Sequence, residues 1–278
     1  MKTTLLLRHL ALARNITLRS ILPGMASLLL LGPSAQAEPP SHDPSRVIRN
    51  TDGRYWIFTT GAGIWTMSSS NPQFTDWRAE NTVFPVGTWP SWINQYVTGF
   101  TGTFWAPDVV KIGSTYYCYY SCAGSGAPAA IGVATASNLS GPWTDRGRIV
   151  NGNNCIDPAI LQDGGNMYMS YGNWQSGIDL IQLSTSTGLR QGSSLWRLIP
   201  NQQVEGPFII KNGSYYYLFF QKGLCCNGCS STYYVQVGRS SSVTGPYVDR
   251  NGVNLSSGGG TTFLPNLSGY MRGPGHVG

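Results

Sequence analysis

Four acidic residues occupy comparable places in the sequence: Asp43, Asp108, Asp157 and Glu205. Each stands at the start of a short run of β-forming residues that ends in a glycine-containing turn and continues into an aromatic run. If each run lies beside a common axis, Asp43, Asp157 and Glu205 meet in one cleft. Several carboxyl groups that face each other in a cleft are what acid–base hydrolysis of a sugar linkage requires.

The elements that must position these residues are β-hairpins. A strand, an Asn/Asp-Gly turn and an aromatic strand form a hairpin. The four hairpins start roughly 50 to 65 residues apart, which is the scale of one four-stranded propeller blade with its loops. The 35 glycines, 17 prolines and 11% charged residues also favour short strands and turns. The sequence therefore predicts an all-β domain, a β-propeller.

The first 37 residues have the pattern of a secretory signal peptide. Basic residues precede an apolar run over residues 21–31, and Ala35-Gln36-Ala37 follows as a cleavage site. A transmembrane anchor is the alternative, but the run is about half as long as a spanning helix requires. We therefore expect residues 1–37 to be removed, a secreted extracellular protein, and a single propeller domain over residues 38–278.

The charge of the mature part indicates which kind of partner the protein binds. The leader contains four of the 18 lysines and arginines and no acidic residue, which leaves 14 basic against 12 acidic residues. No basic cluster remains to bind nucleic acid, and a nearly neutral, aromatic-rich chain suits an uncharged glycan. Glycosylation sequons, which fit a secreted glycoprotein, begin at Asn138, Asn212, Asn254 and Asn266.

The cysteines suggest few disulfides. Cys118 and Cys122 are expected on one strand, about 13 Å apart, which forbids a bond between them. Cys225, Cys226 and Cys229 stand close together in the sequence and allow either a bridge between the adjacent pair or a Cys226–Cys229 link. With no histidine nearby in the sequence, a zinc site is a poor alternative.

Several stretches in order resemble glycoside hydrolase family 43. They are His42-Asp43-Pro44, residues 104–109, residues 154–158, residues 204–207 and residues 273–276. Residues 225–233, 237–240 and 244–249 are similar to the endo-1,5-α-L-arabinanase branch of that family. The resemblance covers nearly all of residues 41–278 and implies a five-bladed β-propeller.

The resemblance also implies roles for the acidic residues. Asp43 matches the general base that activates water, Glu205 the general acid that protonates the leaving oxygen, and Asp157 a carboxylate that modulates the acid. An inverting enzyme needs its acid and base on opposite faces of the sugar, about 6.5–9.5 Å apart. The acid must stay protonated, which burial and a neighbouring anion favour. Asp108 is interpreted as structural, and His42 as a structural neighbour of Asp43.

Five further residues are expected to bind substrate. Trp105 matches an aromatic residue at the cleft, with packing between blades as its alternative. Asn154 matches a substrate ligand, and Asn173 and Trp174 are expected to face the cleft. Gly126 is a candidate for a close approach of the substrate to the backbone. His276 matches a histidine that helps to hold an ion, such as calcium, in the central channel; the alternative is a histidine that hydrogen-bonds near Asp157 or Glu205. No other cofactor is expected.

Together these observations predict a secreted inverting glycosidase that cleaves α-1,5-linked arabinan of plant pectin, acting as a monomer without nucleic-acid or membrane partners. One alternative keeps the fold and makes the protein an exo-acting α-L-arabinofuranosidase or a β-xylosidase. Another is an inactive glycan-binding propeller. Because the sequence stops two residues after His276, where the family pattern opens its last blade, we expect a C-terminally truncated chain with an incomplete fifth blade.

Overall fold

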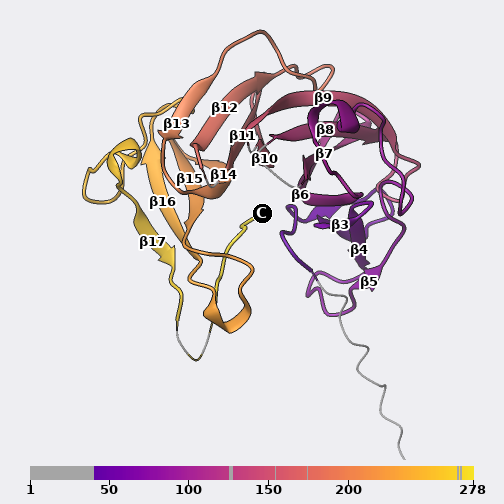
Figure 1. Ribbon diagram of the computed structural model, residues 1–278, viewed down its shortest axis with the longest axis horizontal. Coiled ribbons are helices and arrows are strands. Elements are labelled where there is room, and N and C mark those ends of the chain that lie inside the picture. Colours follow the sequence, from indigo (N-terminus) through magenta and orange to yellow (C-terminus); the bar gives the residue numbers. More distant parts are fainter. Residues whose placement is uncertain (1–40, 125–127, 154, 174, 268, 270) are drawn as a thin grey trace, which may run out of the picture. The chain divides into compact units, whose positions relative to one another are not determined.

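The structure, a computed structural model, describes residues 41–278 apart from 125–127, 154, 174, 268 and 270 (Figure 1). Residues 38–278 form one compact unit, and the fold belongs to that unit. The predicted signal peptide and three predicted substrate-binding residues lie outside the described residues; the three are Gly126, Asn154 and Trp174.

The described residues form four antiparallel sheets. Blade 1 contains β1 (Ile48–Arg49), β2 (Tyr55–Thr59), β4 (Trp65–Ser69) and β5 (Arg78–Ala79). Blade 2 contains β3 (Gly61–Ala62), β6 (Thr103–Ile112), β7 (Thr115–Ala123), β8 (Pro128–Ala136) and β9 (Thr144–Asn153). Blade 3 contains β10 (Ile156–Asp163), β11 (Asn166–Asn173), β12 (Gly177–Leu183) and β13 (Trp196–Pro200). Blade 4 contains β14 (Glu205–Asn212), β15 (Tyr215–Lys222), β16 (Tyr234–Ser240) and β17 (Thr261–Leu264).

Helical structure in the described part of the chain is short. It comprises α1 (Ile93–Tyr96) and the 3₁₀ turns Gly228–Ser230 and Leu255–Ser257. No helix there is long and apolar enough to cross a membrane. The predicted all-β class is confirmed.

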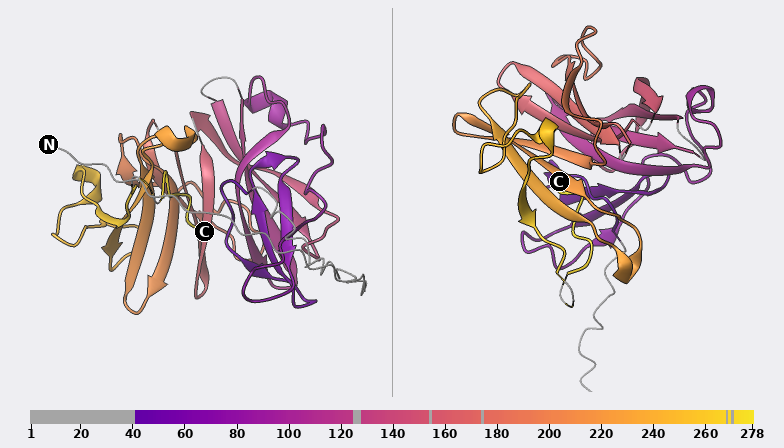
Figure 2. Two further views of the ribbon diagram at one scale, coloured as in Figure 1. Left: turned by 90° about the horizontal axis from the view of Figure 1, so that it is seen from below. Right: turned by 60° about the vertical axis from the view of Figure 1, so that its left-hand side comes forward.

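The sheets are arranged as propeller blades. The inner strand β10 contacts both β6 and β14, and Figure 1 shows the sheets following one another around a centre where the C-terminal segment lies. Both views of Figure 2 also place that segment among the sheets. The predicted β-propeller is therefore confirmed.

The predicted number of five blades is wrong for the described residues, which form four. The segment Gly273–His276, expected to open a fifth blade, contains no strand. A strand needs a partner to satisfy its backbone N–H and C=O groups, and no described strand pairs with this segment.

The predicted hairpins follow from local sequence. β6 and β7 are joined by Gly113-Ser114, and β14 and β15 by Gly213-Ser214. Both glycines have a φ of 59°, a conformation that residues with a Cβ rarely adopt. These turns connect antiparallel neighbours, as the Asn/Asp-Gly and Gly-Ser patterns predict.

Apolar layers between successive blades form the core. In β7, Tyr116, Cys118 and Tyr120 pack toward blade 1, whereas Tyr117 and Tyr119 pack toward blade 3. Both faces of the strand are thus buried, which explains why its sequence is a nearly continuous aromatic run rather than an alternating one. A similar layer joins blades 3 and 4. Cys118 and Cys122 both lie on β7 and are not bonded to each other, as predicted; both are free thiols.

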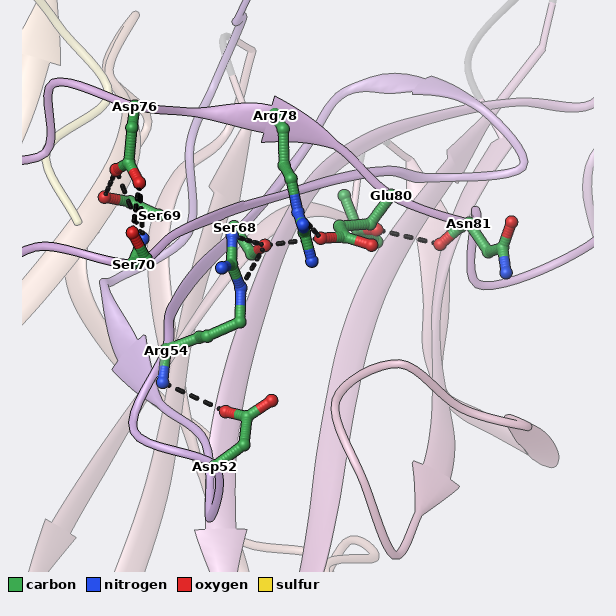
Figure 3. A network of polar contacts seen from close by, with 10 residues as sticks. Asp52, Arg54, Ser68, Ser69, Ser70, Asp76, Arg78, Glu80 and Asn81 are labelled. Atoms are coloured by element: carbon green, nitrogen blue, oxygen red, sulfur yellow. Dashed lines mark hydrogen bonds and ion pairs between the residues drawn. The ribbon is translucent and has the colours of Figure 1, made fainter.

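Polar contacts hold the outer strands of blade 1 together (Figure 3). Arg54 Nε donates to Ser68 Oγ at 2.9 Å, and that hydroxyl donates to Glu80 Oε1 at 2.5 Å. Arg78 Nε donates to the same carboxylate oxygen at 2.7 Å. Because β5 is only two residues long, these side chains supplement a short backbone ladder.

Candidate active site

The first strand of each blade carries the same irregularity. In β6, β10 and β14 the pairing register shifts at a dipeptide that ends in proline: Ala106-Pro107, Asp157-Pro158 and Gly206-Pro207. Proline has no N–H to donate, so such a bulge is one of the few places in a sheet that accept it.

Blade 1 repeats this geometry just before β1. Thr60 N donates to His42 O at 2.9 Å, and Ser45 N donates to Phe58 O at 2.8 Å. Asp43-Pro44 therefore lies between two backbone contacts, as the proline dipeptides of the other blades do. The four blades share a bulge that sequence reasoning did not find, because a bulge is defined by the partner strand.

The bulge separates the four acidic residues into three kinds. Asp43 and Asp157 lie in the bulge, Glu205 lies one residue before it, and Asp108 lies immediately after it. The interpretation that all four occupy comparable blade positions is therefore wrong. Since side chains alternate along a strand, these register differences separate the directions of Glu205 and Asp108 from those of the two bulge residues.

The backbone at the bulge is strained. Asp43 has a φ of 48° and Asp157 a φ of 57°. This left-handed region is uncommon for residues other than glycine, although Asp and Asn tolerate it best. In blade 4 a glycine, Gly206, takes the corresponding conformation at 57°. Such strain persists where surrounding structure enforces it, and it concentrates at functional sites.

These bulges contribute to a cavity of about 220 Å³. The predicted residues Asp43, Asp157, Glu205, Trp105 and His276 all line it. The other lining residues are His42, Thr60, Ile156, Cys225, Cys226 and Tyr233. Asn173 ends β11, and its side chain is outside the described part of the structure.

Asp43 is held as a carboxylate. Its Oδ2 lies 2.7 Å from His42 Nδ1 and accepts from Thr60 Oγ1 at 2.8 Å. Burial by itself would raise the pKa of Asp43, but the His42 bond, the nearby His276 and the Thr60 hydroxyl outweigh it, and the pKa lies below its usual value. His42, expected to be only a structural neighbour, is thus the main partner of this carboxylate.

The pKa of Glu205 is shifted in the opposite direction. Burial, together with the negative charge of Asp43, raises the pKa of Glu205 above its usual value, and a hydrogen bond from Tyr233 opposes part of that rise. Tyr233 Oη donates to Glu205 Oε1 at 2.9 Å. This tyrosine belongs to the sequence stretch that resembled the arabinanase branch, but nothing in its type or spacing pointed to Glu205.

Asp157 is the most buried of the three carboxyl groups, with 7% of its surface exposed. Its Oδ2 accepts from Gly206 N at 3.0 Å, and its own N–H donates to Ser121 Oγ at 2.9 Å. Burial first, then the negative charges of Glu205 and Asp43, raise the pKa of Asp157 well above its usual value. Through Gly206 it contacts the backbone next to Glu205.

Trp105 is 41% exposed at the cavity and is absent from the buried layers between blades. The alternative of packing between blades is therefore not supported. Asp108, by contrast, is buried and paired: Arg46 Nε and Nη2 donate to its two oxygens at 2.8 and 2.6 Å. That pair agrees with the structural interpretation of Asp108.

His276 lies beside the proposed base. Its Nδ1 lies 3.7 Å from Asp43 Oδ1, so its acidic neighbour is Asp43 rather than Asp157 or Glu205. In the part of the chain that the structure describes, no group of three His, Cys, Asp or Glu side chains could hold a metal ion. One imidazole beside one carboxylate supplies few of the six to eight oxygen ligands that calcium takes, and the ion that the resemblance implies at His276 stays a prediction.

The cysteine alternatives are resolved in favour of the adjacent pair. Cys225 and Cys226 form a disulfide, and Cys229 is a free, exposed thiol. Sequence reasoning allowed this bridge but did not place it at the cavity. A loop side chain can be assigned to a cleft only when the fold of the loop is known.

A propeller whose inner strands bring carboxyl groups together in one cavity is the architecture of a glycoside hydrolase. Comparison with known sequences agrees: the glycosyl hydrolases family 43 profile matches residues 39–277, and the chain belongs to this family.

Individual relatives are identical to the chain at about a third of the aligned residues. A probable arabinan endo-1,5-α-L-arabinosidase A of Aspergillus clavatus is 36% identical, over 85% of this chain and 77% of the relative. An extracellular exo-α-(1→5)-L-arabinofuranosidase of Cellvibrio japonicus is 34% identical, over 80% of this chain and 70% of the relative. The structure of an endo-arabinanase from Bacillus licheniformis superposes with a TM-score of 0.76 at 36% identity, covering 85% of this chain and 83% of that one.

Proposed function

We propose that the protein is a secreted inverting glycosidase that cleaves α-1,5-linked L-arabinan of plant pectin. The observation that carries the proposal is one cavity with two carboxyl groups of opposite pKa shift, Asp43 lowered and Glu205 raised. Carboxyl groups whose environments push their pKa values apart are suited to act as base and acid. The substrate is supported by the relatives, whose names specify arabinan or α-(1→5)-linked arabinofuranose.

In this proposal Asp43 is the general base. Its lowered pKa keeps it ionised, so it can accept a proton from water that attacks the anomeric carbon. Glu205 is the general acid: its raised pKa keeps a proton available for the oxygen of the leaving sugar. Inversion follows because the water attacks from the face opposite to the departing sugar.

Asp157 is proposed to modulate the acid. Its contact with the N–H of Gly206 holds the backbone beside Glu205, and any negative charge on Asp157 disfavours ionisation of Glu205. Trp105 offers an exposed aromatic face at the cavity on which a sugar can stack. Asn154, Asn173, Trp174 and Gly126 remain proposed substrate-binding residues on the strength of the family resemblance.

The direct test is Glu205→Ala. We expect hydrolysis of linear arabinan to fall by at least about 100-fold, because the acid contributes on the order of 10²–10⁴ to such reactions. Glu80→Ala is the matched control, since Glu80 lies in the outer polar contacts of blade 1 (Figure 3). If Glu205→Ala hydrolysed arabinan as fast as the parent, the assignment of the acid would be wrong.

We propose the endo mode of action, although relatives of both modes are similar to this chain. Product analysis on linear arabinan distinguishes them. Cleavage within the chain gives a mixture of oligomers early in the reaction, whereas exo action gives one small product from the start. Arabinoxylan and xylan serve as control substrates, and release of xylose from them would favour the β-xylosidase alternative.

Secretion and a monomeric state complete the proposal. Secretion is supported by the leader pattern and by a relative that is named extracellular. The monomeric state is carried over from the sequence analysis and stays a prediction. An N-terminus of the secreted protein at Glu38 and a single-chain mass in solution are the expected measurements.

A further inference from the structure

The disulfide Cys225–Cys226 lies at the cavity but has no role in the proposed acid–base chemistry. It lies in the loop 223–233 between β15 and β16, and both cysteines line the cavity that also contains the three carboxyl groups. Both residues are exposed to solvent. A bridge that faces an active cavity calls for an explanation other than core packing.

Stabilisation of the fold by a cross-link does not explain the bridge. In the chain-entropy account, a disulfide stabilises a protein by closing a loop, and the gain grows with the number of residues in that loop. Adjacent cysteines enclose no intervening residue and bring no distant parts of the chain together. The bridge constrains only its own dipeptide.

Hydrogen bonds within the loop hold the disulfide in place. Leu224 N donates to Thr232 Oγ1 at 2.9 Å, and Thr232 N donates to Leu224 O at 3.0 Å. Asn227 N donates to Ser231 Oγ at 3.0 Å. These bonds close the loop on both sides of the cysteines, so the bridge is presented to the cavity by an organised support.

The disulfide also contacts the opposite side of the cavity. Cys226 Sγ lies 3.6 Å from His42 Nε2, whose Nδ1 lies 2.7 Å from Asp43 Oδ2. The loop of blade 4 thus reaches the segment that carries the proposed base. The two cysteines therefore share the cavity lining with Asp43 and Glu205.

We propose that the Cys225–Cys226 disulfide is a substrate-contacting wall of this cavity, against which the C–H face of a sugar unit next to the scissile bond packs. Disulfide sulfur is polarisable and donates no hydrogen bond, so it offers dispersion contact to C–H groups. With Trp105 it supplies apolar surface, while the carboxyl groups supply the polar contacts. The inference rests on the proposed glycosidase function.

The test measures binding without turnover. In a Glu205→Gln background, titration calorimetry with a linear α-1,5-linked arabino-oligosaccharide gives the Kd of the oxidised protein. Treatment with tris(2-carboxyethyl)phosphine breaks the Sγ–Sγ bond and yields two thiols, while the phosphine takes an oxygen from water to become its oxide. We expect reduction to raise the Kd about tenfold, the loss of roughly one good contact. Adding Cys225→Ser and Cys226→Ser should have a similar effect.

The neighbouring Cys229 provides the control. It is an exposed free thiol in the same loop but does not line the cavity, so Cys229→Ser should leave the Kd unchanged. Unchanged thermal midpoints show that the variants fold. If the variant with both Cys225→Ser and Cys226→Ser does not fold, the Kd of the reduced parent tests the inference instead. Equal Kd values for oxidised and reduced protein would overturn the inference alone. Absence of binding by the oxidised protein would overturn the proposed function together with it.

Discussion

At the scale of single residues, the cavity separates two carboxyl groups by their hydrogen-bond donors. Asp43 receives an imidazole and a hydroxyl, whereas Glu205 receives only the phenol of Tyr233 among the described side-chain bonds. The two pKa values consequently move in opposite directions despite the burial of both groups. In a pH–rate profile, removal of an Asp43 donor should therefore shift the acidic limb, and removal of the Glu205 donor should shift the basic limb.

Tyr233→Phe should move the basic limb. The Tyr233 bond favours the ionised form of Glu205 and lowers its pKa, so its removal raises that pKa, and activity persists to higher pH. We expect a shift on the order of one unit in the profile of kcat/KM. Tyr247→Phe, which removes a buried phenol bonded to Val243 O outside the cavity, should leave the limb in place. A downward shift for Tyr233→Phe would contradict the assignment.

His42→Ala should move the acidic limb. His42 lowers the pKa of Asp43 through the bond to Oδ2, so its loss raises the pKa of the proposed base, and activity falls off at higher pH than in the parent. Thr60→Val removes the second donor and should cause a smaller shift in the same direction. The profile of kcat/KM between about pH 3 and pH 7 measures both. An unmoved acidic limb in both variants would exclude Asp43 as the titrating base.

At the scale of elements, one ion pair ties three blades together at the axis. Arg46 comes from the segment before β1, and Asp108 from β6; Arg46 Nη2 also donates to Ile160 O of β10 at 2.5 Å. The N–H of Ile160 donates in turn to Asp108 Oδ2 at 2.8 Å. The pair lies just beyond the bulges, so it helps to set the relative positions of the strands that carry the cavity.

Arg46→Met should therefore lower the free energy of unfolding by about 3–5 kcal/mol, because it leaves the buried Asp108 carboxylate without its cation. The double variant Arg46→Met/Asp108→Leu should recover part of this loss, since no charge is then left buried. Arg78→Met at the exposed pair with Glu80 should change stability by less than about 1 kcal/mol. Urea denaturation measures all three. Equal effects of the two arginine substitutions would show that the Arg46 pair is not structural.

The hairpins were predictable from the sequence because their signals are local. A glycine turn between a β-branched run and an aromatic run specifies the pair β6–β7 without reference to the rest of the chain. The shared bulge was not predictable, since Asp157-Pro158 is an irregularity only relative to Ser170 and Gly172 on the partner strand. The interpretation that the acidic residues occupy comparable positions was wrong for the same reason. The convergence of Asp43, Asp157 and Glu205 in one cavity was nevertheless predicted, because each lies near the start of an inner strand.

The contacts of Tyr233 and of the Cys225–Cys226 bridge were beyond the sequence for another reason. Both belong to a loop whose path depends on long-range hydrogen bonds, including Asn266 Nδ2 to Ser231 O at 2.8 Å. Residue type and spacing identify such a loop as a family feature but do not show where its side chains lie.

At the scale of the whole molecule, the carboxyl groups that the proposed activity needs lower the stability of the fold near neutral pH. Asp157 and Glu205 have raised pKa values in the folded protein, so the folded state holds their protons more tightly than the unfolded chain does. The stability that these protons confer is fully present below the unfolded pKa, about 4. It is lost as the pH rises through the folded pKa values. The contribution of these two carboxyl groups to stability is thus smaller near neutral pH than in mild acid.

Asp157→Asn should reverse much of that loss. Asparagine tolerates the left-handed backbone of residue 157 and can still accept from Gly206 N, but it has no charge to bury. We expect the variant to be more stable than the parent by about 1–2 kcal/mol at pH 8 and nearly equal to it at pH 4 in urea denaturation. Activity should fall, because the modulating carboxyl group is gone. Asp163→Asn gives the opposite sign: its pKa is lowered by Lys211 and Tyr216, so that variant should lose stability at pH 8. An Asp157→Asn protein less stable than its parent at pH 8 would mean that the ionised carboxylate supports the fold rather than opposes it.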